Sequence, residues 1–338
     1  MRIIDSHTHL DCHNPKKLVE MVDHFGYEKF GVMAIPCSRN PLNTLECLLV
    51  KRHAPGRAYV FGGMVYTDGQ PATGDDHEKQ LRLMLDAGCD GWKLLESKPS
   101  VYRALQIPLD SDVFEKAFAL AERENVPLTW HAGDPATFWS LDTAPAFAIE
   151  NNWTCVGEGF PTLEKIYSEV ENVMARHPKL RTAMAHLYFT SDDRAHAERM
   201  LDAYENFWLD LTPGSEMYYA FHEDVSGWRA FFEKYQDKLV FGTDMVDSEG
   251  DVVFDSQDTI VDLVLKTFME DKPFEIMGQK CMGMNLPQTV TEKILARNFE
   301  GRVGQPKPIN EKGLNAYVEY LMPRLTKEEQ KKAEELLK

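Results

Sequence analysis

Eight short segments rich in β-branched and aromatic residues alternate along the chain with segments whose apolar residues recur at helical spacing. Strands that alternate with helices build one parallel sheet, which is either open and doubly wound or closed into a barrel. This alternation therefore limits the fold to two architectures. The predicted strands are Arg2–His9, Phe30–Cys37, Ala58–Tyr66, Gly91–Glu96, Pro127–Gly133, Arg181–Tyr188, Phe207–Thr212 and Leu239–Asp244.

The segments between and after the strands carry signals for helix starts. The dipeptide Asn14-Pro15 is typical of an N-cap followed by the first helical residue. Two later pairs, Thr289 with Glu292 and Thr326 with Glu329, have the spacing of a capping box. We therefore expect helices to begin at these three places.

Residues suited to catalysis end several predicted strands, including the first and the last. In an open sheet the outermost strands lie far apart, whereas in a barrel they are neighbours. The sequence therefore predicts an α/β fold, a (β/α)8 TIM barrel, over residues 1–304. After Gly304 the composition changes to prolines and a charged helical tail. Residues 305–338 are expected to form a C-terminal helical extension that packs on the barrel and is not a separate domain.

Histidines and one aspartate occupy the carboxyl ends of these strands. His7 and His9 are separated by one residue on the first strand, so both imidazoles face the same side and make half of a zinc site. The fifth, sixth and eighth strands end in His131, His186 and Asp244, each of which alone is explained equally well as a capping or buried polar residue. Together the five residues predict a metal site, because the active sites of this architecture lie at that end of the barrel.

Composition narrows the classes of function. The formal net charge of −17 over 338 residues disfavours a nucleic-acid backbone or an anionic membrane surface as partner. No signal-peptide pattern opens the sequence, and no apolar stretch approaches the roughly 20 residues that span a bilayer. The six cysteines are scattered without a C-x-x-C pair, as expected in a reducing compartment. We expect a cytoplasmic protein that binds a small-molecule substrate and neither nucleic acid nor membrane; a homodimer is expected only because dimers are the commonest assemblies.

The order of the strand-end motifs resembles that of the amidohydrolase superfamily, and within it the branch that includes aminocarboxymuconate semialdehyde decarboxylase and related hydrolases, hydratases and lactonases. The resemblance covers most of the chain, from Met1 to Gly304. Each motif is moderately specific alone and strongly specific in this order. The motifs are the H-x-H opening, Pro178–His186, Phe241–Asp244 and Leu286–Asn298.

The resemblance implies a barrel of the metal-dependent hydrolase type in which four residues hold one divalent metal: His7, His9, His131 and Asp244. Zinc is the expected metal, with manganese as an alternative. His186 would lie beside it as a catalytic group or as a ligand of a second ion. Asp244 would orient a metal-bound hydroxide and pass its proton to the leaving group, and His186 would polarise the substrate carbonyl. No organic cofactor is expected, since the sequence contains neither a glycine-rich dinucleotide fingerprint nor a P-loop.

Lys93 lies in the fourth predicted strand and leaves the number of metals open. In binuclear members of the superfamily a lysine of this strand is carboxylated and bridges two metals, and Lys93 matches that order. In the decarboxylase-like branch a lysine also stands here without a bridge, and it would then bind a substrate carboxylate or pair with Glu96. One metal is the preferred interpretation, and a carbamate-bridged pair is the alternative. A lysine inside the barrel needs some partner, because an unpaired buried charge is costly.

Aromatic residues in two loops at the same end are candidates for the pocket wall. Trp139 follows the fifth strand, and Tyr218 and Tyr219 follow the seventh. Together with Lys93 they are expected to contact the substrate. Aromatic residues at these places also suit helix packing, so both interpretations stay open at this point.

Hydrolysis of an amide, ester or lactone of a small molecule by metal-bound hydroxide is the function that these residues favour. The alternative is a lyase, a metal-dependent non-oxidative decarboxylase of an aromatic or unsaturated carboxylic acid. Decarboxylases of the branch hold the carboxylate with an arginine in an early loop, but residues 10–31 contain none, and the nearest is Arg39. The net charge of −17 disfavours a metal-dependent nuclease. The intact set of candidate ligands disfavours a non-catalytic binding protein.

Overall fold

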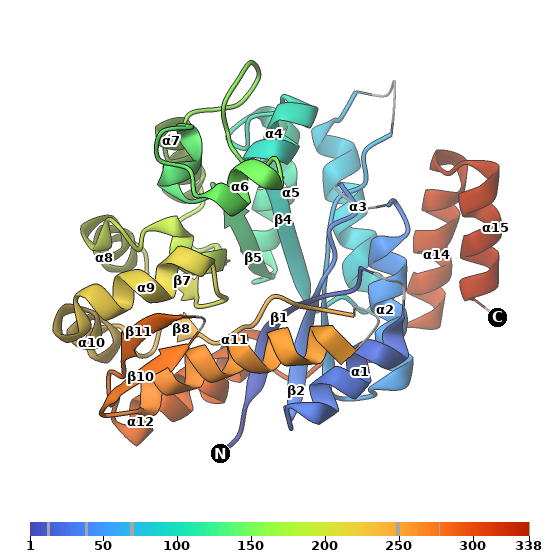
Figure 1. Ribbon diagram of the computed structural model, residues 1–338. Helices are drawn as coiled ribbons and strands as arrows, with labels where there is room; N and C mark the ends of the chain where they lie inside the picture. The colour runs from blue at the N-terminus through green and yellow to red at the C-terminus, as the bar shows by residue number, and fades with distance from the viewer. Residues whose placement is uncertain (12–13, 38–39, 68–70, 248–250, 277, 338) are drawn as a thin grey trace.

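The computed structural model describes residues 1–11, 14–37, 40–67, 71–247, 251–276 and 278–337. Its centre is one parallel sheet in the order β8-β7-β6-β5-β4-β3-β2-β1-β9, so strands that follow one another along the chain are neighbours (Figure 1). Parallel neighbours need a crossover connection, and helices supply the crossovers from β1 to β8. The strands are β1 (Ile4–His9), β2 (Lys29–Met33), β3 (Ala58–Gly62), β4 (Gly91–Ser97), β5 (Pro127–Ala132), β6 (Arg181–Met184), β7 (Phe207–Asp210), β8 (Leu239–Val240) and β9 (Met245–Val246).

The two ends of the sheet meet through one short segment of the chain. β8 pairs with β7, and β9, which follows β8 directly in sequence, pairs with β1. Between them the main-chain N–H of Ser6 donates to the carbonyl of Phe241 at 2.9 Å, and the N–H of Asp244 donates to the carbonyl of His7 at 2.9 Å. β1 is therefore bonded both to β2 and to the last strand segment, as in a closed barrel. The predicted α/β fold of the TIM-barrel type is confirmed.

Helices cover the outside of the sheet (Figure 1). A two-stranded antiparallel hairpin, β10 (Pro273–Ile276) and β11 (Gln279–Met282), follows the last long helix of the barrel and was not expected from the sequence. The helices are α1 (Pro15–His24), α2 (Asn43–His53), α3 (Gly74–Ala87), α4 (Pro99–Leu105), α5 (Asp112–Arg123), α6 (Ala146–Glu150), α7 (Leu163–Arg176), α8 (Arg194–Ala203), α9 (Ser215–Glu223), α10 (Val225–Lys234), α11 (Asp251–Met269), α12 (Gln288–Glu292), α13 (Asn298–Val303), α14 (Glu311–Leu321) and α15 (Lys327–Leu336), and the short 3₁₀ or π turns are η1 (Ala136–Trp139), η2 (Ala185–Phe189), η3 (Lys293–Arg297) and η4 (Met322–Arg324).

The alternation of side chains along each strand separates two environments. On β4 and β5 the outward residues Trp92 and Trp130 are fully buried against α5, where the ring of Phe118 lies 5.3 and 5.6 Å from theirs. The next residues along the same strands, Lys93 and His131, face the other way, into the barrel, because successive strand residues point to opposite sides. Apolar packing therefore fixes the outside of the sheet and leaves polar side chains to gather inside its mouth.

Two of the expected helix starts are confirmed and one is wrong. Asn14 caps α1, with Pro15 as the first helical residue, and Thr326 with Glu329 makes both bonds of a capping box at α15. The pair Thr289–Glu292 does not cap a helix. α12 already begins one residue before it, so the threonine lies inside the helix.

Several strands end earlier than the sequence predicts. β2 and β3 stop at Met33 and Gly62, where the chain enters the loops at the barrel mouth. β6 stops at Met184 rather than at Tyr188, because His186–Phe189 have left-handed φ angles of 54°, 55°, 60° and 52°. Non-glycine residues avoid this region, and they persist in it where the surrounding structure enforces it, often at functional sites. The histidine after β6 therefore stands on a strained turn and not on the strand.

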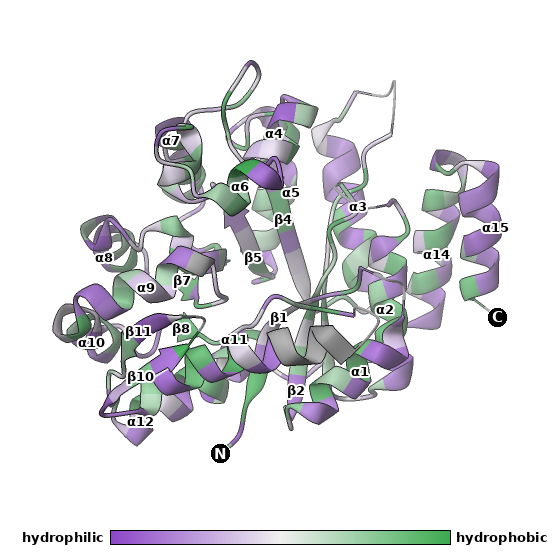
Figure 2. Ribbon diagram, viewed as in Figure 1, coloured by the Kyte–Doolittle hydropathy of each residue, from purple (hydrophilic) through white to green (hydrophobic). Residues whose placement is uncertain are grey.

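The C-terminal helix α14 packs against α3 of the barrel (Figure 1). A Cβ at Gly313 of α14 would overlap the carbonyl oxygen of Asp86, so the glycine lets α14 approach α3 closely. Lys51 and Asp90 form a buried ion pair at 2.6 Å, and Asp90 Oδ1 also accepts the main-chain N–H of Lys307 at 2.7 Å. α15, on the outside, is mostly hydrophilic (Figure 2). Among the described residues, the helices are all too short or too polar to cross a membrane.

Candidate active site

The predicted metal and catalytic residues gather at one end of the barrel, where the carboxyl ends of the strands meet. Two of them, His186 and Asp244, have left-handed backbone conformations with φ of 54° and 59°. Because the carboxyl ends of the strands meet here, the barrel brings together residues that are far apart in the sequence. β1 supplies His7 and His9, β4 supplies Lys93, β5 supplies His131, and the turns after β6 and β8 supply His186 and Asp244.

Three of these residues form a compact group of donor atoms. His7 Nε2 lies 3.3 Å from His9 Nε2, and Asp244 Oδ1 lies 3.2 Å from His9 Nε2 and 3.6 Å from His7 Nε2. All three donor atoms lie within 4.8 Å of one another, close enough to share one metal ion. His7 is fully buried, whereas the side chain of Asp244 is 40% exposed and so faces the open side of the group.

The outer nitrogens of both imidazoles are engaged on the side away from this donor group. His7 Nδ1 lies 2.6 Å from Asp210 Oδ2, and His9 Nδ1 lies 2.8 Å from the carbonyl oxygen of Met33. A carboxylate and a carbonyl accept hydrogen bonds, so each Nδ1 carries the proton and each Nε2 carries a lone pair. Two lone pairs that face each other at 3.3 Å beside a carboxylate oxygen are a donor set that fits a divalent cation.

Burial and local charge favour the protonation states that bind a metal. Burial lowers the pKa of His7 to about 4, so its ring is neutral near neutral pH. Burial alone would raise the pKa of Asp244, but its contacts with His9 and His7 hold it well below its usual range, so the carboxyl is ionised. Neutral imidazoles and an ionised carboxylate are the forms in which these groups act as ligands.

Asp210, at the end of β7, is a site residue that the sequence analysis missed. It is 1% exposed and contacts His7. Burial would raise the pKa of Asp210, but its hydrogen bonds with His7 and Thr212 hold it below its usual value. Its position was the available signal, since an acidic residue ends the buried strand in Trp208-Leu209-Asp210.

Lys93 is buried beside the donor group. It is 1% exposed, and its Nζ lies 3.0 Å from His7 Nε2. Burial lowers the pKa of Lys93 to about 8, although the charges of Asp244 and Asp210 act in the opposite direction. The lysine therefore lies beside the donor group in either of its expected roles, as a substrate contact or as a carboxylated bridge to a second metal.

Glu96, the partner considered for Lys93, belongs to a different chain of hydrogen bonds. Tyr66 Oη lies 3.0 Å from Glu96 Oε1 and 3.2 Å from His77 Nε2, and His77 Nδ1 lies 3.0 Å from the carbonyl oxygen of Thr73. Because the carbonyl accepts from Nδ1, His77 Nε2 accepts from the tyrosine, and the carboxyl of Glu96 is the donor at the other end. Burial raises the pKa of Glu96 to about 7, which agrees with a protonated carboxyl.

His131 and His186 lie together on the β5–β6 side of the mouth. Their ring centroids are 4.9 Å apart, and the ring of His186 lies 5.8 Å from that of His7. His131 Nε2 lies 3.3 Å from Asp134 Oδ1, which Lys98 contacts at 2.9 Å. Burial lowers the pKa of both histidines. His131 is thus outside the group of three donors, and its role as a ligand stays a prediction.

The aromatic residues named as pocket wall are largely engaged in packing. Trp139 is half-buried and donates its Nε1–H to the carbonyl of Pro161 at 2.9 Å. Tyr218 is fully buried and donates to the carbonyl of Leu211 at 2.9 Å, which gives it a packing role, while Tyr219 is half-buried. Substrate contact by these three residues stays a prediction, and the position of Tyr218 gives it no support.

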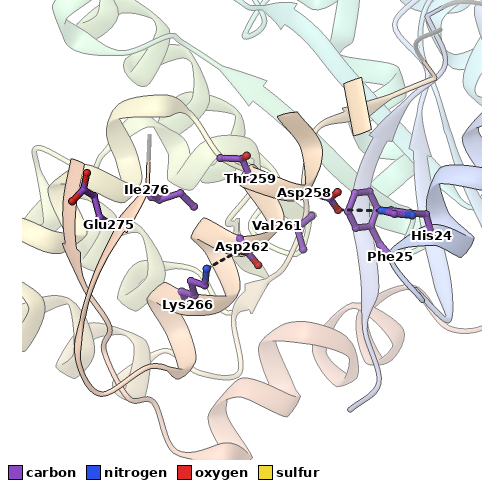
Figure 3. A pocket seen from close by; sticks show the side chains of 9 residues that line it. All are labelled: His24, Phe25, Asp258, Thr259, Val261, Asp262, Lys266, Glu275 and Ile276. Atoms are coloured by element: carbon purple, nitrogen blue, oxygen red, sulfur yellow. Dashed lines mark hydrogen bonds and ion pairs between the residues drawn. The ribbon is translucent and has the colours of Figure 1, made fainter. Parts of the chain in front are cut away.

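A cavity of about 530 Å³ lies on the outer helices and not at the donor group (Figure 3). Its walls come from α1, α11 and β10 and include His24, Asp258 and Glu275. His24 Nε2 lies 3.1 Å from Asp258 Oδ1 along this wall. The predicted site residues do not line this cavity, so it is separate from the candidate active site.

Similarities to known proteins exist at two levels, in sequence and in fold. The family model described as amidohydrolase matches residues 44–298. The fold is similar to that of a probable 2-pyrone-4,6-dicarboxylic acid hydrolase from Acinetobacter baumannii, with a TM-score of 0.56 and 13% identity over 90% of this chain and 100% of that one. It is also similar to 4-oxalomesaconate hydratase from Rhodopseudomonas palustris, with a TM-score of 0.49 and 11% identity over 94% and 98% of the two chains. No curated protein matches the sequence.

Proposed function

Because the chain belongs to the amidohydrolase family, we propose that it is a metal-dependent hydrolase that cleaves an amide, ester or lactone bond of a small molecule. The observation that carries the proposal is the donor group of His7, His9 and Asp244, whose donor atoms lie within 4.8 Å of one another. The similar A. baumannii protein, named as a probable hydrolase of a pyrone dicarboxylic acid and solved with citric acid bound, agrees with it. The narrower branch around the semialdehyde decarboxylase stays a prediction.

The chemistry of the donors fits zinc, with manganese as the alternative. A divalent metal at this position supplies Lewis acidity and lowers the pKa of water at its open site to about 7. His7 and His9 would hold such an ion through Nε2, because Asp210 and the carbonyl of Met33 keep their ring protons on Nδ1.

The chain's own groups divide the remaining tasks. Asp244 is ionised and faces the open side, so it is placed to accept a proton from attacking water and return it to the leaving group. Lys93 offers N–H donors to a substrate oxygen or carboxylate. His186 donates its Nδ1–H to the carbonyl of Thr212 at 3.2 Å, so its Nε2 accepts. This tautomer suits a base or a ligand, and it does not suit the expected role of a donor that polarises a carbonyl.

Metal content and reaction products test the proposal together. Protein purified without added metal is expected to hold about one equivalent of zinc and to hydrolyse members of a panel of carboxylate-bearing esters, lactones and amides. His9→Ala should lose metal and activity, while His53→Ala, at an exposed position, should keep both. About two equivalents of zinc that fall in Lys93→Ala would establish the carbamate-bridged alternative.

Two results would overturn the proposal. One is a chelator-stripped protein that hydrolyses the same substrate at an unchanged rate. The other is release of carbon dioxide from an aromatic or unsaturated acid in place of hydrolysis, which is the reaction of the decarboxylase alternative. Arg39, the nearest candidate for a carboxylate-binding arginine, lies outside the described residues. The two reactions are therefore separated by this product assay and not by the position of the arginine.

A further inference from the structure

The end of β7 contacts two imidazoles of the site at once. We propose that Asp210 and Thr212 are positioning residues that fix the tautomers of His7 and His186, so that both rings present an unprotonated Nε2 to the metal site. The proposal rests on the proposed metal-dependent function. It assigns a role to β7, from which the sequence analysis named no metal or catalytic residue.

The contact between Asp210 and His7 is short and shielded from water. Asp210 Oδ2 lies 2.6 Å from His7 Nδ1, and the two side chains are 2% and 1% exposed. The other carboxylate oxygen accepts the main-chain N–H of Thr212 at 2.9 Å and its hydroxyl at 2.5 Å. Because two donors hold that oxygen, the carboxylate cannot turn, and Oδ2 stays aimed at the ring as an acceptor.

Thr212 extends the same arrangement to the second imidazole. Its carbonyl oxygen lies 3.2 Å from His186 Nδ1. A carbonyl only accepts, so the ring proton of His186 also lies on Nδ1. Residues 210 and 212 therefore set the tautomers of two rings whose centroids are 5.8 Å apart.

Gly242 makes room for these contacts. A Cβ at this position would overlap Thr212 Oγ1 and would lie 2.9 Å from His7 Cβ and 3.0 Å from Asp210 Oδ1. Any side chain at position 242 would push apart the groups that carry the contacts. The glycine of Phe241–Asp244, a motif that belongs to the family resemblance, thus has a physical reason in this chain.

A purely structural ion pair is the competing explanation for the Asp210 contact. In that case His7 would be protonated on both nitrogens and would stabilise the fold through its charge. The position of Lys93 argues against this, because its Nζ lies 3.0 Å from His7 Nε2. An amine that donates at this distance needs a lone pair on Nε2, and it would repel a protonated ring. With Lys93 as an ammonium, which can only donate, this contact agrees with an unprotonated Nε2.

Asp210→Asn separates the two explanations. Thr212 donates to one side-chain atom of residue 210, so the amide oxygen takes that place and the amide NH₂ faces His7. The NH₂ donates where the carboxylate accepted, so His7 is expected to move its proton from Nδ1 to Nε2. Nitrogen-15 NMR of the His7 ring in the metal-free protein reads this change, and a zinc titration should show affinity weaker by about 10–100-fold.

Two further variants serve as controls. Asp5→Asn also removes a buried carboxylate, but Asp5 contacts His7 through the main-chain N–H at 3.0 Å, so the ring tautomer should stay unchanged. Asp210→Glu keeps an acceptor on the ring, so it should keep the proton of His7 on Nδ1 and restore part of the zinc affinity.

A His7 ring that carries its proton on Nε2 in the wild-type protein, or that keeps it on Nδ1 in Asp210→Asn, would overturn the proposal. Equal losses of zinc affinity in Asp210→Asn and Asp210→Glu would also overturn it, because they would indicate packing alone. The NMR measurement needs no metal. If the tautomer shifts as expected while zinc fails to bind, the proposed function fails and the positioning role stands.

Discussion

The mouth of the barrel has two sides: the β1–β8 side with His7, His9 and Asp244, and the β5–β6 side with His131 and His186. On the first side both outer nitrogens are bonded to fixed acceptors, and the Nε2 atoms converge to 3.3 Å. On the second side the Nε2 of His131 is already 3.3 Å from a carboxylate oxygen, and His186 stands on a left-handed turn.

This difference shows which part of the site is arranged in advance for a cation. Donors whose outer atoms are fixed need little reorganisation when they take up an ion. The carboxylate beside His9 Nε2 belongs to Asp244, which is itself one of the grouped donors. The carboxylate beside His131 Nε2 belongs to Asp134, which is outside the group, so His131 must give up that contact before it can become a ligand. We therefore expect the β1–β8 side to dominate metal affinity and the β5–β6 side to act mainly on the substrate.

The largest expected effect compares one histidine from each side. His9→Ala should weaken zinc binding by well over about 100-fold, because it removes one of the three donors on the β1–β8 side. Loss of a residue that only hydrogen-bonds a ligand costs up to roughly 100-fold. His131→Ala should weaken it by about 10-fold or less. Zinc titrations of the two purified variants measure the difference. Equal losses would erase the contrast and restore the four-ligand set that the family resemblance implies.

A smaller effect is expected at Glu96, on β4 between the two sides. Burial raises its pKa from the ordinary 4.5 to about 7, so the folded state binds its proton more tightly than the unfolded chain does. The free energy of unfolding should therefore fall as pH rises from 4.5 to about 7, by about 3 kcal/mol, and this contribution should then level off.

Glu96→Gln should remove this contribution, because the amide NH₂ donates to Tyr66 in place of the carboxyl O–H. Urea unfolding of both proteins across this pH range measures the difference in slope, from which other titrating groups cancel. An unchanged slope would mean that Glu96 is ionised in the folded protein. It would then be a counter-charge for Lys93, and the lysine would be less available to the β1–β8 side.

The smallest effect tests how tightly the β1–β8 side is packed. Gly242→Ala should destabilise the protein by about 1–3 kcal/mol, because its Cβ has no room beside Thr212 and His7. Gly301→Ala is the matched control, since a Cβ in that helix meets nothing within 4 Å. It should be neutral or stabilising by up to about 1 kcal/mol. Thermal unfolding of both variants measures the difference in stability. An unchanged stability of Gly242→Ala would show that the residues around Gly242 are less tightly packed than described.

The sequence predicts the barrel and the three donors on the β1–β8 side, because both follow from the period of a strand and from the order of the strands. His7 and His9 share a face through the period of a strand, and Asp244 reaches them because the first and last strands of a barrel are neighbours. The same reasoning placed Lys93 inside the barrel. Period, strand order and closure are properties that one chain reveals without any contact map.

What the sequence did not reveal depends on contacts between distant segments. Asp210 acts on a ring 203 positions away, so nothing in its own neighbourhood marks its partner. The run from His186 to Phe189 is apolar and aromatic, as in a strand, yet tertiary packing turns it left-handed. Tyr218 has the residue type of a pocket wall, and only the surrounding core shows that it is buried.

The segment that links β8 to β9 has a consequence for how the protein is made. Thr243 of this segment contacts Asp5 across 238 positions of the chain, and Asp244 is its immediate neighbour. A ribosome releases β1 early, but the two histidines wait for their third donor until nearly three quarters of the chain has been synthesised. Contacts between such distant segments form late in folding. Binding of the proposed metal would then follow closure of the barrel, and the bound ion would stabilise the contact between the first and last strands.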